Sequence, residues 1–146
     1  MADRTRAGAS ITGDGMIQGA DNSNEPVRVL YVDDEKSLTQ ISTDLLEDFG
    51  YQVFCAYDGR EALQLFQKEV SGYFSVVVTD ESMPVMGGIE LARKLKQLAP
   101  EMPVVLCSGF LLTMQEQGIE ETNIKAVLLK TDICTELPGI LERLVG

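Results

Sequence analysis

The fold is decided at residues 27–34, which read VRVLYVDD. This short, β-branched run ends abruptly in two carboxylates, a pattern that predicts a β-strand followed by a polar loop. Residues 75–80, which read SVVVTD, repeat the pattern, and their almost continuous apolar run is typical of a strand covered on both faces. Both segments therefore predict strands whose carboxyl ends carry acids.

Strands and helices alternate along the rest of the chain. We expect strands at residues 27–32, 52–56, 75–79, 103–107 and 126–129. The spacing of apolar residues predicts helices at residues 38–49, 58–70, 89–98, 111–121 and 136–145, with the weakest pattern at 111–121. Five strands that alternate with five helices predict an α/β fold, an open and doubly wound parallel sheet with right-handed crossovers.

Several residues predict where the helices begin and end. Gly50 is the expected C′ residue of the first helix, and Asp58 with Glu61 predicts a capping box for the second. Thr135 is the expected N-cap of the last helix, with Pro138 in its first turn. The residues expected to face the core are Leu38, Ile41, Leu45 and Phe49, then Leu63, Phe66 and Val70, and finally Ile89, Ala92, Leu95 and Leu98.

The composition changes near Pro26 and divides the chain into two parts. Residues 1–25 are rich in Gly, Ala, Ser, Asp and Asn, and their few apolar residues have no period. Such a segment cannot bury enough surface to offset its ordering entropy, so we expect a flexible tail or linker. Residues 26–146 are expected to form one domain, since this length supports one core and not two.

Charge and composition exclude several classes of function. The net charge of −11 disfavours direct contact with nucleic acid or anionic lipid, and the absence of histidine excludes Ser/His and Cys/His catalysis and any phosphohistidine of the chain's own. The three cysteines lack CxxC spacing and predict buried thiols in a reducing compartment. Without a membrane span or signal sequence in the pattern, we expect a cytoplasmic protein.

Polar residues collect at the predicted strand ends. Asp33 and Asp34 follow the first strand, Asp80 the third, Ser108 the fourth and Lys130 the fifth. Because ligands of such sheets bind beyond the carboxyl ends of the strands, these side chains should share one site. Taken singly, the acids after the first strand could be helix N-caps, the serine a turn residue and the lysine a solvated charge. Together they predict a hard divalent cation, most naturally Mg²⁺, that offsets the repulsion between carboxylates.

These motifs resemble the receiver domain of response regulators in two-component signalling. The resemblance rests on VLYVDDE at 29–35, DESMPVMGG at 80–88, Ser108-Gly109 and Leu128-Leu129-Lys130, and it covers about residues 27–145. It implies a flavodoxin-like sheet with strand order 2-1-3-4-5. Each motif alone is weak or moderately specific, but all of them fall at the ends of predicted strands.

The resemblance also implies a role for each site residue. Asp80 would accept a phosphoryl group from a phosphohistidine on a sensor histidine kinase or a histidine phosphotransfer protein. Asp33, Asp34, Asp80 and the backbone carbonyl of Ser82 would hold Mg²⁺. Ser108 and Lys130 would bind phosphoryl oxygens after transfer. The chain would then be a phosphorylatable switch rather than an enzyme, and it would signal through protein contacts without a DNA-binding output.

The sequence departs from the family at three places. Val127 stands where the family usually has an aromatic residue, and Thr131 follows the lysine where the family has a proline after a cis bond. At Lys130–Thr131 we expect either a trans bond with a reshaped loop or a cis bond held by its surroundings. The third departure is the weak helix at 111–121, where Leu111 to Gln115 form either core or an interface; the face around residues 111–145 is one candidate surface for a homodimer.

Three alternative functions stay open at this point. A phosphatase that forms an aspartyl phosphate would want an acid two residues after the nucleophile, where this chain has Ser82. A flavodoxin-like cofactor binder would want a phosphate-binding loop in place of Asp33 and Asp34. A degenerate receiver that serves only as a docking surface fits the changes at Val127 and Thr131.

Overall fold

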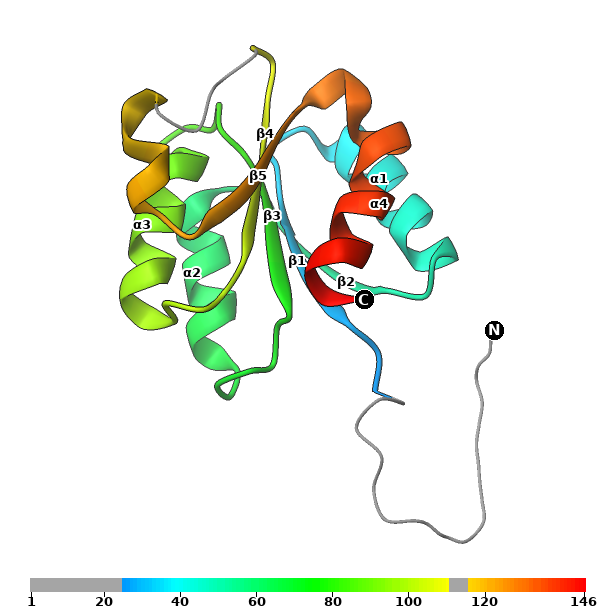
Figure 1. Cartoon of the computed structure of the whole chain (residues 1–146), viewed down its shortest axis with the longest axis horizontal. Coiled ribbons are helices and arrows are strands. Elements are labelled where there is room, and N and C mark those ends of the chain that lie inside the picture. Colours follow the sequence, from blue (N-terminus) through cyan, green and yellow to red (C-terminus); the bar gives the residue numbers. More distant parts are fainter. Residues whose placement is uncertain (1–24, 111–115) are drawn as a thin grey trace, which may run out of the picture.

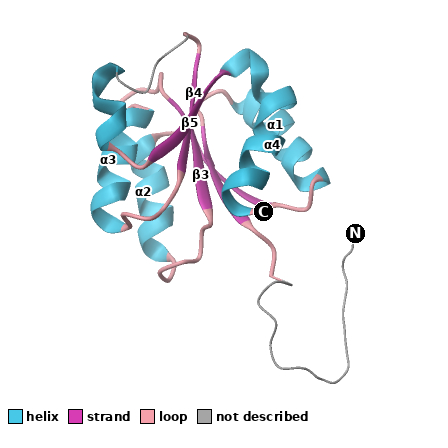
Figure 2. Cartoon of the chain, in the orientation of Figure 1, coloured by secondary structure: helices cyan, strands magenta, loops and turns pink. Residues whose placement is uncertain are grey.

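The computed structural model describes residues 25–110 and 116–146, and within them it has five strands and four α-helices. The parallel sheet has the order β2-β1-β3-β4-β5, so the predicted α/β class, parallel pairing and strand order are confirmed (Figure 2). The elements are β1 (Arg28–Val32), α1 (Lys36–Asp48), β2 (Gln52–Ala56), α2 (Gly59–Lys68), β3 (Val76–Asp80), α3 (Gly88–Leu98), β4 (Val104–Ser108), η2 (Glu116–Glu121), β5 (Ile124–Leu129), η3 (Lys130–Asp132) and α4 (Ile133–Val145).

Helices cover both faces of the sheet, as Figure 1 shows, with α2 and α3 on one side and α1 and α4 on the other. The core accordingly has two halves. Leu30, Val77 and Leu106 point toward α2 and α3, whereas the alternate residues Tyr31, Val78 and Cys107 point toward α1 and α4. The central strands β3 and β4 are buried at every position, which is why their sequences read as continuous apolar runs.

The fourth predicted helix, at residues 111–121, is not confirmed as an α-helix. Its first five residues, 111–115, lie outside the described residues, and Glu116–Glu121 forms a 3-10 helix instead of an α-helix. Most of the predicted tail, residues 1–24, also lies outside the described part. At residues 116–121 the sequence pattern therefore predicted a helix but not its 3-10 type.

The predicted start of the last helix, at residue 136, was wrong. The helix begins at Ile133 with Asp132 as its N-cap, and Thr135 lies inside it, where its hydroxyl donates to the Asp132 carbonyl at 3.2 Å. Pro138 is consequently an interior residue rather than part of the first turn. The helix starts early because the 3-10 turn Lys130–Asp132 runs directly into it, through a trans Lys130–Thr131 bond.

The buried face of α1 differs from the predicted one. Thr39, Ser42 and Leu46 are buried, whereas Ile41 and Phe49 are exposed. The two hydroxyls can be buried because both are hydrogen-bonded: Ser42 accepts from the Tyr31 phenol of β1 at 2.9 Å, and Thr39 donates to the Glu35 carbonyl one turn earlier at 2.9 Å. Two further residues predicted to face inward, Val70 and Leu98, are also exposed.

Two helix termini follow the prediction closely. Asp58 caps α2 by accepting from the Glu61 backbone N–H at 2.8 Å, and the Glu61 carboxylate accepts from the Tyr57 backbone N–H at 2.8 Å. Gly50, at φ +94°, follows the α1 C-cap Phe49, because the left-handed conformation there favours glycine.

Gly88, the first residue of α3, allows that helix to approach the sheet. A Cβ atom at this position would collide with the Asp80 carbonyl oxygen and would lie 2.7 Å from Cδ1 of Leu106. A glycine is therefore needed for the close contact between the start of α3 and the end of β3.

The cysteines are free thiols, as the sequence predicts, but only Cys107 is buried, while Cys55 is half-buried and Cys134 is exposed. No helix in the described part of the chain has both the length and the apolar character that a membrane span requires.

Candidate functional site

Three carboxylates meet at the carboxyl ends of β1 and β3. These strands are neighbours, so Asp33 and Asp34, which follow β1, lie beside Asp80 at the end of β3. One carboxylate oxygen from each residue lies within 4.8 Å of the other two. Asp33 and Asp80 are buried and Asp34 is exposed, so the cluster opens to solvent on one side.

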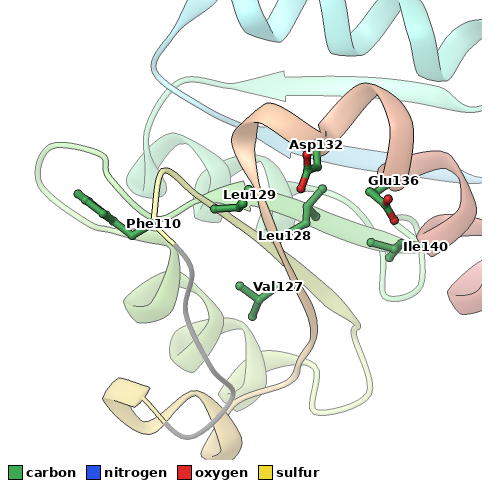
Figure 3. Close-up of a pocket in the computed structure, with 7 residues that line it drawn as sticks. All are labelled: Phe110, Val127, Leu128, Leu129, Asp132, Glu136 and Ile140. Atoms are coloured by element: carbon green, nitrogen blue, oxygen red, sulfur yellow. The ribbon is translucent and has the colours of Figure 1, made fainter.

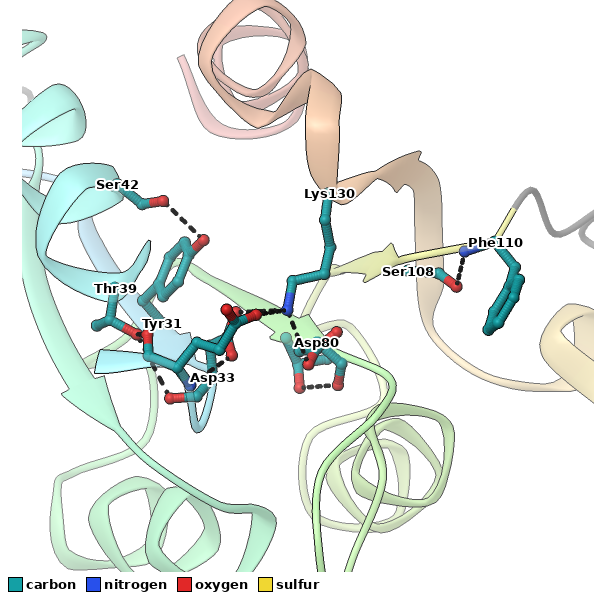
Figure 4. Close-up of polar contacts among 10 residues, drawn as sticks. Tyr31, Asp33, Thr39, Ser42, Asp80, Ser108, Phe110 and Lys130 are labelled. Atoms are coloured by element: carbon teal, nitrogen blue, oxygen red, sulfur yellow. Dashed lines mark hydrogen bonds and ion pairs between the residues drawn. The ribbon is translucent and has the colours of Figure 1, made fainter. Parts of the chain in front are cut away.

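Lys130 joins this cluster from the end of β5. Its Nζ lies 3.3 Å from Oδ2 of Asp80 and 3.4 Å from Oδ2 of Asp33. Figure 4 shows the lysine side chain reaching toward these two acids. The structure therefore brings together four residues predicted from the sequence, and it excludes the alternative that Lys130 is a solvated surface charge.

Burial sets the ionisation of the two buried acids. It raises the pKa of Asp80 by disfavouring the charged carboxylate, and the Lys130 ammonium opposes this rise. Burial also raises the pKa of Asp33, against a hydrogen bond from the Glu35 backbone N–H, and the negative charge of Asp80 raises it further. Burial of both acids and the charge of Asp80 beside Asp33 therefore disfavour the two carboxylates and favour a cation beside them.

Lys130 responds in the opposite way. Burial alone would lower the pKa of its ammonium, but the hydrogen bond to Glu35 and the charges of Asp33 and Asp80 outweigh burial and raise it. The lysine therefore stays positively charged in the site. Beneath it, burial raises the pKa of the Cys107 thiol to about 12, so this cysteine is an inert part of the core.

Glu35 also belongs to the site, a position that its sequence pattern did not indicate. Its backbone N–H donates to Oδ1 of Asp33 at 2.9 Å, and its carboxylate lies 2.6 Å from Nζ of Lys130. Glu35 is also the N-cap residue of α1, so neither Asp33 nor Asp34 caps that helix. The only signal in the sequence was its place directly after the acid pair, which does not indicate the direction of a long side chain.

Ser108, the last residue of β4, has not joined the acid cluster. Its hydroxyl oxygen accepts a hydrogen bond from the Phe110 backbone N–H at 3.0 Å, and Figure 4 shows it apart from Asp80. The side chain is 2% exposed. The predicted contact of Ser108 with a phosphoryl group would therefore need a change at residues 108–110.

The loop from β3 to α3 positions Ser82, which is exposed, and its carbonyl makes no hydrogen bond among the described residues. Glu81 ties this loop to the helix, since its carboxylate accepts from the Ile89 backbone N–H at 2.8 Å. Further along, the Met86 N–H donates to the Pro84 carbonyl at 2.8 Å, which makes Val85, at φ 73°, the centre of a γ-turn. This turn geometry is rare and strained, particularly for a β-branched residue.

The donor set fits a magnesium ion. Oδ1 of Asp80 is a buried carboxylate oxygen without a hydrogen-bond partner among the described residues. Mg²⁺ takes oxygen ligands at about 2.0–2.1 Å and retains several waters, so it suits a few carboxylates spaced as these are. Asp33, Asp34, Asp80 and the free Ser82 carbonyl are the residues that would hold it.

A separate pocket lies beside β5 and α4, as Figure 3 shows. Its volume is about 200 Å³, and its lining residues are Phe110, Val127, Leu128, Leu129, Asp132, Glu136 and Ile140. Val127 lines this pocket, at the position where receiver domains usually have an aromatic residue. The smaller valine leaves no ring that could move in response to the acid cluster.

Known proteins share both the sequence pattern and the fold. Residues 29–137 match the response regulator receiver domain family. The sensor histidine kinase RcsC of Salmonella typhimurium is 31% identical over 109 residues, which are 75% of this chain but only 11% of the length of RcsC. The response regulator receiver protein CpdR of Brucella abortus is 28% identical over 118 residues, which cover 81% of this chain and 96% of CpdR.

Among solved structures, the chemotaxis protein CheY4 of Vibrio cholerae has a TM-score of 0.75 and 30% identity, covering 83% of this chain and 100% of CheY4. The similarity therefore extends over the sheet, its helices and the strand ends that carry the acids. On these grounds the chain belongs to the response regulator receiver domain family of two-component signalling.

Proposed function

We propose that this protein accepts a phosphoryl group on Asp80 in a magnesium-dependent reaction. The observation that carries the proposal is the buried Oδ1 of Asp80, which has no hydrogen-bond partner among the described residues while Oδ2 faces Lys130 at 3.3 Å. One oxygen thus faces the Lys130 ammonium, and the other is available to a metal ion, an arrangement that suits a phosphoryl acceptor. No other acid cluster in the described residues combines these features.

In the proposed reaction, an Asp80 carboxylate oxygen attacks the phosphorus of a phosphohistidine. The new P–O bond forms as the P–N bond breaks, and the electron pair of that bond returns to the imidazole nitrogen. Such transfers pass through a loose transition state, so the protein mainly positions groups and neutralises charge. Lys130 supplies one positive charge, and Mg²⁺ held by Asp33, Asp34, Asp80 and the Ser82 carbonyl would supply the charge stabilisation of a divalent ion.

The donor in this proposal is a separate protein, either a sensor histidine kinase or a histidine phosphotransfer protein. The chain contains no histidine, so it cannot carry the phosphohistidine itself. The similarity to a segment of the sensor histidine kinase RcsC supports a partner of this class. The domain would comprise residues 26–146, act in the cytoplasm and signal through protein contacts, in keeping with its net charge of −11.

The output proposed for this chain begins at residues 108–110. Because Val127 carries no aromatic ring, Ser108 would have to exchange its Phe110 N–H contact for a phosphoryl oxygen and move the loop backbone directly. Dimerisation through the face around residues 111–145 is a further part of this proposal, and light scattering before and after phosphorylation tests it.

The proposal is tested with acetyl phosphate and MgCl₂. Intact-mass measurement should detect one acid-labile phosphoryl adduct on the wild-type protein and none on Asp80→Asn. Asp48→Asn, which removes an exposed acid at the end of α1, is the matched control and should be phosphorylated normally. An adduct on the Asp80→Asn variant would refute the assignment, and steady phosphate release from a panel of monoesters would favour a phosphatase instead.

A further inference from the structure

The Lys130 ammonium lies close to three carboxylates. The shortest contact is with Oε1 of Glu35, at 2.6 Å, whereas the contacts with Asp80 and Asp33 measure 3.3 and 3.4 Å. The partners also differ in solvent exposure: the Glu35 side chain is 61% exposed and each aspartate side chain is 2% exposed. The most exposed acid thus makes the closest contact.

The backbone of Glu35 explains why its side chain is available. As the N-cap of α1, Glu35 has an extended backbone, at φ −86° and ψ 100°, and its carboxylate makes no capping hydrogen bond. Its own N–H is held by Oδ1 of Asp33 at 2.9 Å. The residue is therefore anchored to the acid cluster through its backbone, and its carboxylate is directed to Lys130 instead of to the helix.

We propose that Glu35 is a positioning residue that holds the Lys130 ammonium and competes for it with the phosphoryl group on Asp80. This inference rests on the proposed function of Asp80. In the resting protein the ammonium donates to Glu35 and Asp80 and lies 3.4 Å from Asp33. A phosphoryl oxygen on Asp80 must displace one of them, and Glu35 is the partner that water can rehydrate most readily.

The charge of Glu35 should disfavour the phosphorylated state. When Glu35 is charged, it opposes the phosphorylated state in two ways: it retains the ammonium, and its own charge lies near the incoming anion. When a neutral side chain replaces Glu35, Lys130 can turn fully toward the phosphoryl oxygens. Pairs as exposed as this one change equilibria modestly, so the expected effect is about two- to fivefold.

The test is a titration of the protein with beryllofluoride and MgCl₂, a non-covalent mimic of the phosphoryl group, followed by amide NMR spectra. Glu35→Gln should bind the mimic about two- to fivefold more tightly than wild type, and its phosphorylated form should hydrolyse more slowly. Glu47→Gln is the matched control, because it removes the same charge from the exposed surface of α1 away from Lys130. Equal effects of the two variants would overturn the proposal.

A double-mutant cycle separates action through Lys130 from simple charge repulsion. In a Lys130→Met background, Glu35→Gln should leave the affinity for beryllofluoride unchanged, and an undiminished gain would refute a role through the lysine. A further measurement needs no phosphoryl mimic: in the free protein, Glu35→Gln should speed the exchange of the Lys130 ammonium protons with water. The two proposals can fail separately. If the ammonium signal responds but wild type binds no beryllofluoride, the contact between Glu35 and Lys130 is confirmed, whereas its competition with a phosphoryl group and the proposed function of Asp80 are both refuted.

Discussion

The Lys130 ammonium lies 3.3 Å from Asp80, although the two residues are 50 positions apart in the chain and stand at the ends of strands separated by β4. This pairing depends on the parallel sheet, which brings all strand ends to the same edge. It also leaves a large surplus of negative charge at that edge, because one ammonium faces Asp33, Glu35 and Asp80 together. Removing or neutralising part of that charge should therefore change both stability and magnesium binding.

Asp80→Asn should stabilise the protein at pH 7. Burial raises the pKa of Asp80, which means that the folded state disfavours its charged form relative to the unfolded chain. The neutral amide removes this cost, and the free energy of unfolding in urea should rise at neutral pH. Asp48→Asn is the control for loss of a surface acid and should change stability by no more than about 0.5 kcal/mol.

The same pKa shift predicts how stability depends on pH. Between neutral pH and the ordinary aspartate pKa of 3.8, the folded protein binds protons at Asp80 and Asp33 that the unfolded chain does not. These two groups therefore favour folding increasingly as the pH falls through this range. Urea unfolding at several pH values should show a smaller rise on acidification for Asp80→Asn than for wild type, and an identical dependence would contradict the shift.

Magnesium should stabilise the folded protein, because the acid cluster exists only when β1 and β3 are paired. At a free concentration 100 times the dissociation constant, a ligand of the folded state adds about 2.7 kcal/mol. Thermal unfolding should therefore shift upward with MgCl₂ but not with NaCl of equal ionic strength. Asp34→Asn should lose most of this shift, and Asp48→Asn should retain it.

Val85→Gly should stabilise the protein by about 1 kcal/mol, since the positive φ of the γ-turn strains a β-branched residue and suits glycine. The melting temperature should rise by about 4 °C for a domain of this size. Val70→Gly is closely matched, because Val70 is 76% exposed and Val85 is 75% exposed, but Val70 has no positive φ. If both substitutions have the same effect, backbone strain is not the cause.

Gly88→Ala and Gly139→Ala should have opposite effects. The added Cβ at position 88 would meet the Asp80 backbone and the Leu106 side chain, so we expect a loss of about 1–3 kcal/mol and weaker magnesium binding. At position 139, inside α4, the added Cβ meets no described atom within 4 Å apart from its own helix backbone and chain neighbours, and alanine should gain about 0.5–1 kcal/mol from helix propensity. Urea unfolding of both variants provides the comparison.

The strands and the main acids of the site could be predicted because their signals are local. A buried parallel strand reads as an apolar run, and its last residue reports what stands at the sheet edge; Asp80 and Lys130 were found in this way. The α1 face was mispredicted because Thr39 and Ser42 are buried through hydrogen bonds, which an apolar pattern does not reveal. The Glu35 contact and the Val85 turn depend on side-chain and backbone directions that no residue spacing encodes.

No loop separates Lys130 from the helix that follows it. Lys130 opens a 3-10 turn that passes without interruption into α4, whose residues Leu137 and Leu141 are buried against the sheet. A displacement of the lysine backbone cannot be absorbed by a flexible linker in this segment. A displacement of Lys130 would consequently shift α4 as a rigid body. This coupling does not require an aromatic residue on β5.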